Sequence, residues 1–98
     1  MSNIVGIQRL DFEAGAKIFE QGSKGKAAYM VVSGRVEIIV LPKQGPPHSL
    51  GFLTKGKVFG ELSMFDGYEH MATAVATEPS TVSAIGRQHF QMLVDNMD

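Results

Sequence analysis

Glycine residues divide this chain into short runs of strand-forming residues, and the spacing of these glycines constrains the fold more than any other feature. The 98 residues include 11 glycines and 4 prolines, which are more turn-forming residues than a helical bundle of this size needs. The runs between the glycines are rich in β-branched and aromatic residues, which strands favour. We therefore predict short strands at residues 7–12, 17–19, 28–32, 36–41, 50–53, 58–59, 72–76 and 81–85.

Two pairs of successive runs are expected to be antiparallel neighbours. The runs at 28–32 and 36–41 are joined through Ser33-Gly34, which suits a tight hairpin because glycine adopts positive φ at little steric cost. The runs at 72–76 and 81–85 are expected to form a last antiparallel pair.

The periodicity changes at two places in the second half of the chain. Residues 61–65 read as a single helical turn, closed by Asp66-Gly67. An amphipathic helix is expected in the tail, where apolar residues fall at i, i+3, i+4 and i+7: Phe90, Leu93, Val94 and Met97. The prediction is a mainly β fold, a double-stranded β-roll of jelly-roll type with one short internal helix and a C-terminal helix.

The charge balance argues against several kinds of partner. Nine basic and ten acidic residues give a formal net charge of −1. No basic block could neutralise several phosphates, so direct nucleic-acid binding is not expected. We find no polybasic patch for a membrane surface and no apolar run near the roughly 20 residues of a bilayer span. Since no secretory signal is apparent at the start, a cytoplasmic location is the default expectation.

The residue types that catalysis needs are scarce. The chain has no cysteine, which excludes a disulfide scaffold, a thiolate nucleophile and a cysteine-ligated metal. His48, His70 and His89 are not spaced as a metal-dependent β-barrel enzyme would need them, so no metal site is expected. No serine has a histidine at a spacing that suggests a nucleophile and its base. We therefore expect a domain that is not an enzyme by itself.

Residues 58–76 are the most informative stretch, because they read as strand, glycine, helical turn, loop and strand. Gly60 has no Cβ, so a ligand could approach the main chain closely there. The amides of Glu61, Leu62 and Ser63 would be donors at a helix N-terminus, where phosphate is attracted. Glu61 would accept hydrogen bonds from sugar hydroxyls. On spacing alone, a capped helical turn in a connecting loop accounts for the same residues.

The same stretch resembles the phosphate-binding cassette of cyclic-nucleotide-binding domains, which occur in catabolite-activator-type regulators, kinase regulatory subunits and gated channels. The match lies in Phe59-Gly60-Glu61-Leu62-Ser63 and in Ala72-Thr73, and residues 59–73 are called the cassette below. Upstream, residues 12–22 and 29–36 are similar to the family's opening and central hairpin, so the resemblance covers roughly residues 10–95. It implies a β-roll flanked by helices, with a short cassette helix and a nucleotide held between cassette and roll.

Two departures make the cassette degenerate relative to the family pattern. His70 stands where the family has the arginine that pairs with the cyclic phosphate, and Met71 stands where a small residue is usual. Imidazole lacks the planar, permanently charged fork of a guanidinium. Loss of such a charge-assisted bond costs about 1.5–3 kcal/mol. The residues expected at the ligand site are Gly60, Glu61, Leu62, Ser63, His70, Met71 and Ala72.

Two functions of different classes follow. The first is a regulatory ligand-sensing domain that binds cAMP, cGMP or a related small phosphate ligand weakly or with altered specificity, without a further cofactor, and with His70 as a pH-sensitive substitute for arginine. The second is a degenerate, non-binding roll that contacts a protein partner, an effector domain or a second copy through the C-terminal helix. For either, the resemblance implies a single domain over residues 1–98 that lacks most of the family's N-terminal helices and any effector domain.

Overall fold

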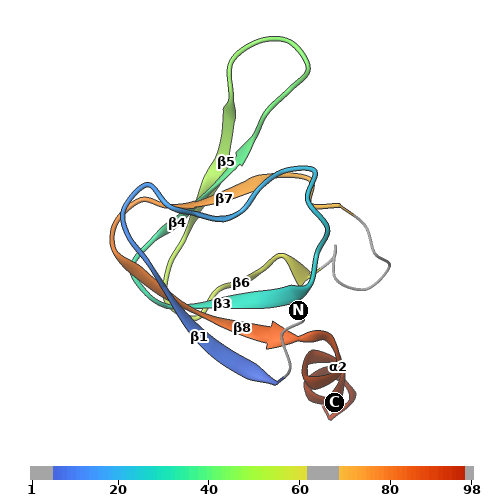
Figure 1. The fold of residues 1–98 in the computed structure, drawn as a ribbon. Helices are drawn as coiled ribbons and strands as arrows, with labels where there is room; N and C mark the ends of the chain where they lie inside the picture. Colours follow the sequence, from blue (N-terminus) through green and yellow to red (C-terminus); the bar gives the residue numbers. More distant parts are fainter. Residues whose placement is uncertain (1–5, 62–68, 97–98) are drawn as a thin grey trace.

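Two four-stranded antiparallel sheets form the body of the fold in the computed structural model, which describes residues 6–61 and 69–96. The strands are β1 (Ile7–Phe12), β2 (Lys17–Phe19), β3 (Ala27–Ser33), β4 (Val36–Val40), β5 (His48–Leu53), β6 (Val58–Phe59), β7 (Thr73–Ala76) and β8 (Ser80–Gly86). One sheet has the order β1-β8-β3-β6 and the other the order β2-β7-β4-β5. Figure 1 shows the two sheets facing each other, with the β4–β5 hairpin projecting from the roll. The predicted mainly β roll is confirmed.

The predicted hairpin between the third and fourth strands is wrong. β3 pairs with β8 and β6, whereas β4 pairs with β5 and β7, so Ser33-Gly34 carries the chain from one sheet to the other. Gly34 has a φ of +90°, and a Cβ there would come within 2.6 Å of the Cα of Ser80. The Oγ of Ser80 accepts a 3.0 Å hydrogen bond from the N–H of Arg35. The positive φ was predicted, but it serves a corner between sheets and not a hairpin.

The last expected pair is wrong for the same reason. β7 pairs with β2 and β4, and β8 pairs with β1 and β3, so residues 77–79 also cross between the sheets. The two crossings are joined, because the N–H of Thr77 donates a 2.9 Å hydrogen bond to the carbonyl oxygen of Arg35. Most successive strands of this roll lie in opposite sheets, and the exception is the β4–β5 hairpin.

The core lies between the two sheets and is small. Its buried cluster consists of Val31, Phe59 and Val82 from the first sheet, with Val36 and Ala74 from the second. Partly buried apolar side chains pack around it: Leu10, Phe12, Ile18, Phe19, Tyr29, Ile38 and Leu53. Burial of the few large side chains supplies most of the stabilisation that is available to a domain of this size.

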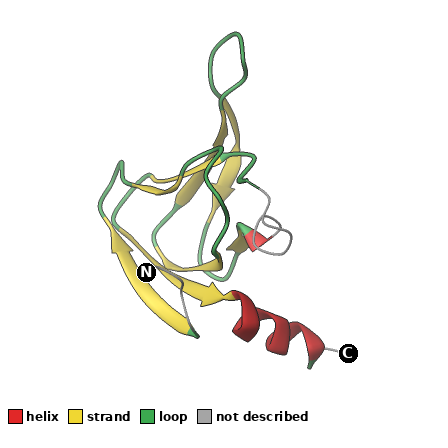
Figure 2. Ribbon diagram, turned by 45° about the vertical axis from the view of Figure 1, so that its right-hand side comes forward, coloured by secondary structure: helices red, strands yellow, loops and turns green. Residues whose placement is uncertain are grey.

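The predicted C-terminal helix is confirmed as α2 (Arg87–Asp95), which follows β8 directly. None of its residues is buried, and Figure 2 shows it extending away from the roll. Of the predicted apolar stripe, Leu93 and Val94 are 45% and 42% exposed, and Met97 lies outside the described residues. No helix within the described ranges is long and apolar enough to cross a membrane.

Candidate functional site

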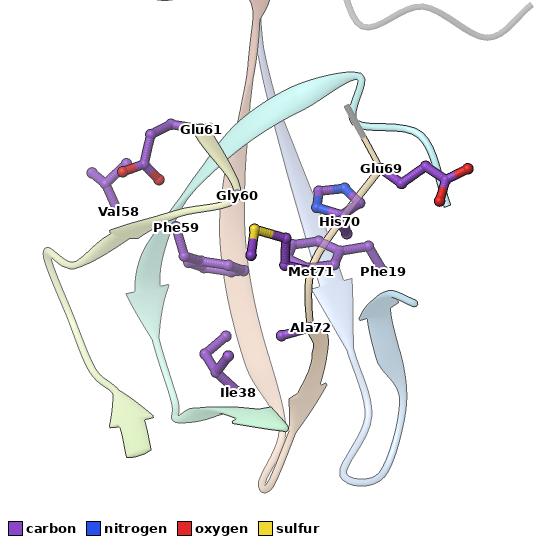
Figure 3. A pocket seen from close by; sticks show the side chains of 10 residues that line it. All are labelled: Phe19, Ile38, Val58, Phe59, Gly60, Glu61, Glu69, His70, Met71 and Ala72. Atoms are coloured by element: carbon purple, nitrogen blue, oxygen red, sulfur yellow. The ribbon is translucent and has the colours of Figure 1, made fainter. Parts of the chain in front are cut away.

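A cavity of about 310 Å³ opens between the end of β6 and the segment that returns into β7. Figure 3 shows the side chains around it. They come from residues 58–61, from residues 69–72, and from β2 and β4. Ten residues line it: Phe19, Ile38, Val58, Phe59, Gly60, Glu61, Glu69, His70, Met71 and Ala72. Five of the seven residues predicted for the ligand site are therefore brought together, and Leu62 and Ser63 lie outside the described residues.

The floor of the cavity is aromatic, and Gly60 lies on it. The ring of Phe19 has its centroid 5.6 Å from that of Tyr29 and 5.9 Å from that of Phe59. Gly60 has a φ of +77°, and a Cβ there would lie 3.1 Å from Phe19 and 3.2 Å from Tyr29. Glycine is thus favoured at this position by its positive φ, and an added Cβ would also press on the rings of Phe19 and Tyr29, whether or not a ligand approaches the main chain.

His70 forms a wall of the cavity and is 5% exposed. Its ring stacks on Phe19, with the centroids 3.6 Å apart and the planes 8° from parallel. Burial lowers the pKa of the His70 imidazole, because desolvation disfavours its charged form. The expected role as a pH-sensitive partner for phosphate stays a prediction, and burial moves the charging of this ring to lower pH.

The main chain of His70 is hydrogen-bonded to the loop between β2 and β3. The N–H of His70 donates to the carbonyl oxygen of Ser23 at 2.7 Å, and its own carbonyl oxygen accepts from the N–H of Gly22 at 2.8 Å. Lys24 and Glu69 form an isolated antiparallel bridge beside these two bonds. Residues 69–70, at the end of the cassette, are therefore paired with residues 22–24 of the loop as in a short antiparallel ladder.

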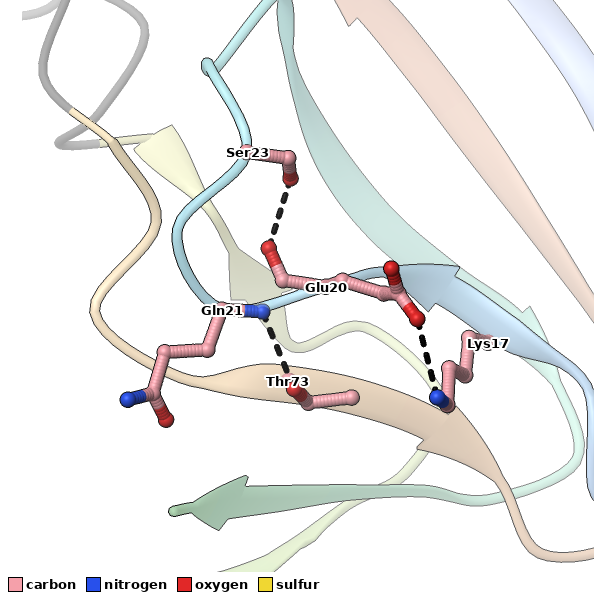
Figure 4. Close-up of polar contacts among 5 residues, drawn as sticks. All are labelled: Lys17, Glu20, Gln21, Ser23 and Thr73. Atoms are coloured by element: carbon pink, nitrogen blue, oxygen red, sulfur yellow. Dashed lines mark hydrogen bonds and ion pairs between the residues drawn. The ribbon is translucent and has the colours of Figure 1, made fainter. Parts of the chain in front are cut away.

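Polar contacts of the same loop extend this ladder into β7 and toward β4. The N–H of Gln21 donates to the Oγ1 of Thr73 at 2.9 Å, as Figure 4 shows. The side-chain amide of Gln21 donates to the carbonyl oxygen of Leu41 at 3.0 Å and accepts from its N–H at 2.7 Å. In the same view Ser23 and Lys17 each contact Glu20, the lysine at 2.9 Å.

Among the described site residues, Met71 does not fill the cavity. Met71 lines it but is 82% exposed, so its bulk does not plug the hollow. In Figure 3 the carboxylates of Glu61 and Glu69 lie at opposite margins, and the apolar side chains lie between them. Within residues 6–61 and 69–96, no three acidic, histidine or cysteine side chains are grouped to hold a metal ion.

Half of the lining was not predicted from the sequence: Phe19, Ile38, Val58, Phe59 and Glu69. Phe59 and Glu69 flank predicted site residues directly, so their positions in the cassette were an available signal. Phe19 and Ile38 come from distant strands, and only the pairing of β2 and β4 with β7 brings them near the cassette.

Comparison with known proteins gives matches over nearly the whole chain. The family model for the cyclic nucleotide-binding domain matches residues 9–97. A cyclic AMP receptor protein of Thermus thermophilus is 37% identical over 87 residues, which are 89% of this chain and 40% of that protein. A regulatory subunit of cAMP-dependent protein kinase from Aspergillus fumigatus is 32% identical over 90% of this chain and 21% of its own length.

A solved structure agrees with the fold. The catabolite activator protein of Thermus thermophilus superposes with a TM-score of 0.84 at 36% identity, covering 91% of this chain and 42% of that one. The chain thus spans well under half the length of these relatives.

Proposed function

Since the chain belongs to the cyclic nucleotide-binding domain family, we propose that it is a regulatory ligand-sensing domain, and not an enzyme by itself, whose ligand site is the cavity beside Gly60. Relatives that carry the names of a cyclic AMP receptor protein and a kinase regulatory subunit support a regulatory role. The ligands proposed for the site are cAMP and cGMP.

The observation that carries this proposal is the cavity itself. Its volume of about 310 Å³ lies at the lower end of the range for small-molecule sites, which are mostly apolar with a few placed polar groups. Phe19, Ile38 and Phe59 provide the apolar surface, and Glu61 provides an acceptor for hydroxyl groups. We propose that Gly60 and the amides of residues 61–63 receive the phosphate end.

Binding of a cyclic nucleotide is proposed to be weak. An arginine at position 70 would offer a charge-assisted, bidentate contact to the phosphate. His70 instead stacks on Phe19 and is nearly buried. Because burial lowers the pKa of its imidazole, the neutral form predominates near pH 7. The missing contact corresponds to about 1.5–3 kcal/mol, or roughly 10- to 100-fold in affinity.

Calorimetric titration with cAMP and cGMP tests this proposal on the wild type and on His70→Arg. We expect the arginine variant to bind about 10- to 100-fold more tightly than the wild type. His89→Arg is the matched control, because it adds the same charge on α2, away from the cavity lining, and should leave the affinity unchanged. Failure of both the wild type and His70→Arg to bind at millimolar ligand would overturn the proposed site.

The pH dependence is a second readout of the same titration. A phosphate at the site would favour protonated His70, so wild-type affinity should rise from about pH 8 to about pH 6, while the arginine variant should be insensitive. Because burial lowers the pKa of His70 in the domain without ligand, the rise is expected to continue below the ordinary histidine range. A wild-type affinity that falls toward pH 6 contradicts a contact between His70 and phosphate.

A second candidate function rests on α2. No residue of this helix is buried, and Leu93 and Val94 present exposed apolar surface, which is characteristic of an interaction site when contiguous. We propose contact with a second copy or an effector segment through this face. Sedimentation of the wild type and Leu93→Glu at increasing concentration tests it, with exposed Gln88→Glu as the control. A wild type that remains monomeric throughout contradicts self-association.

A further inference from the structure

The described part of the cavity lining carries two negative charges and no permanently positive one. Among the described residues the lining contains two carboxylates, Glu61 and Glu69, and neither lysine nor arginine. Figure 3 places the two carboxylates at opposite margins of the lining, with that of Glu69 directed away from the other side chains. A ligand phosphate in this cavity finds no lysine or arginine in the described lining, so main-chain N–H groups, counterions and water alone offset its charge.

The part of the cassette outside the described residues has no basic residue to contribute. Residues 62–68 read Leu-Ser-Met-Phe-Asp-Gly-Tyr, so their only ionisable groups besides the tyrosine hydroxyl belong to Asp66. The acidic residues of the cassette are Glu61, Asp66 and Glu69, and residues 59–73 include no lysine or arginine. The charge imbalance is therefore a property of the whole cassette.

Two other residues could in principle supply a positive charge. His70 lies against the face of Phe19, with centroids 3.6 Å apart, and is 5% exposed, so desolvation disfavours the charged form of its ring. Lys24 pairs through its backbone with Glu69 but is not part of the cavity lining. Neither residue replaces an arginine directed at the ligand.

The features that remain suit a ligand without an anionic group. The apolar and aromatic surface of Phe19, Ile38 and Phe59 suits a flat ring, and Glu61 suits a hydroxyl donor. We infer, building on the function proposed above, that this cavity prefers an uncharged ligand that joins a flat heterocycle to a hydroxyl-bearing sugar. A nucleoside then binds more tightly than its own 3′,5′-cyclic phosphate.

The preference is measured by calorimetric titration of the full chain with matched pairs: adenosine against cAMP, and guanosine against cGMP. For the wild type we expect one nucleoside to bind about tenfold or more tightly than its cyclic phosphate, because burial of the phosphate charge is unfavourable where no lysine or arginine of the described lining pairs with it. His70→Arg is expected to reverse the order within that pair. Added salt should strengthen the binding of the cyclic phosphate and leave the nucleoside nearly unaffected.

The outcomes separate this inference from the proposed function. A wild type that binds a cyclic phosphate as tightly as its nucleoside overturns the inference and keeps the proposed site. A wild type that binds neither, with cAMP or cGMP bound by His70→Arg, also overturns the inference and identifies a degenerate cyclic nucleotide site. Failure of both proteins with all four ligands overturns the proposed function itself. Loss of cyclic phosphate binding in Lys24→Ala would show that Lys24 supplies the cation, which contradicts the inference.

Discussion

Two glycines of this domain have similar backbone angles and are required for different local reasons. Gly34, with φ +90°, lies against Ser80 where the chain crosses from β3 to β4, and Gly60, with φ +77°, lies on the rings of Phe19 and Tyr29. In both places a side chain would meet neighbours as well as an unfavourable dihedral. Position in the fold, and not the dihedral alone, decides how a substitution is tolerated.

Gly34→Ala is expected to destabilise the domain by about 2–4 kcal/mol, since it combines a left-handed backbone with overlap on a neighbouring main chain. The added Cβ would lie 2.6 Å from the Cα of Ser80 and 2.7 Å from the carbonyl oxygen of Pro79. Gly56→Ala is the matched control, because Gly56 has the same φ of +90° with nothing within 4 Å of the added atom. It should cost only about 1 kcal/mol. Urea unfolding measures both, and equal losses would contradict the packing argument.

His70 is expected to make the stability of the domain depend on pH. Burial lowers the pKa of its imidazole in the folded state, so as the pH falls through about 6.5 the unfolded chain takes up a proton before the folded chain does. The stability contributed by neutral His70 is therefore present above that pH and is lost as the pH falls through the interval between the two pKa values.

Urea unfolding on either side of this interval measures the effect. His70→Phe keeps a flat ring on Phe19 and removes the titration, so its stability should fall less in acid than that of the wild type. His48→Gln, which changes an exposed residue, should retain the wild-type pH dependence. The assignment to His70 is contradicted if His70→Phe loses as much stability in acid as the wild type.

At the scale of elements, one glutamine connects the loop after β2 to the end of β4. The side-chain amide of Gln21 both donates to and accepts from the main chain of Leu41, as a neighbouring strand would. The main-chain N–H of Gln21 contacts Thr73 at the start of β7. The loop that holds His70 is thereby coupled to the end of β4, where the β4–β5 loop begins.

Gln21→Ala removes both contacts to Leu41 and is expected to cost about 1–2 kcal/mol. The more specific sign is faster hydrogen exchange of the Leu41 amide, because it loses its acceptor. Gln44→Ala, an exposed change in the β4–β5 loop, should alter neither the stability nor that amide. Unchanged exchange at Leu41 in Gln21→Ala would contradict the proposed coupling.

The sequence was sufficient to locate the strands and insufficient to pair them. Apolar alternation and glycine positions predicted β1, β2 and β6 with their observed bounds, because these signals are local. The same Ser33-Gly34 dipeptide fits a hairpin or a corner between sheets. Which of the two forms depends on the long-range partners of the flanking strands, such as Val82 for Val31 and Ala76 for Val36. Pairing was therefore predicted wrongly at both crossings.

At the scale of the whole molecule, the candidate site has a local part and a tertiary part. The cassette residues Gly60, Glu61, His70, Met71 and Ala72 were predicted from their motif, and all five line the cavity. Phe19 was not predicted, although its ring stacks on His70, because nothing in the sequence places β2 beside the cassette. That contact explains why His70 is poorly suited to replace a charged arginine.

The central claim is that the cavity between cassette and roll is a ligand site. Amide proton–nitrogen spectra of the uniformly labelled wild type, recorded during titration with cAMP to millimolar concentration, test it most directly. The account predicts saturable shifts at Gly60, Glu61 and Ala72, with little change on the exposed face of α2. Shifts confined to α2, or no shifts at all, would contradict it.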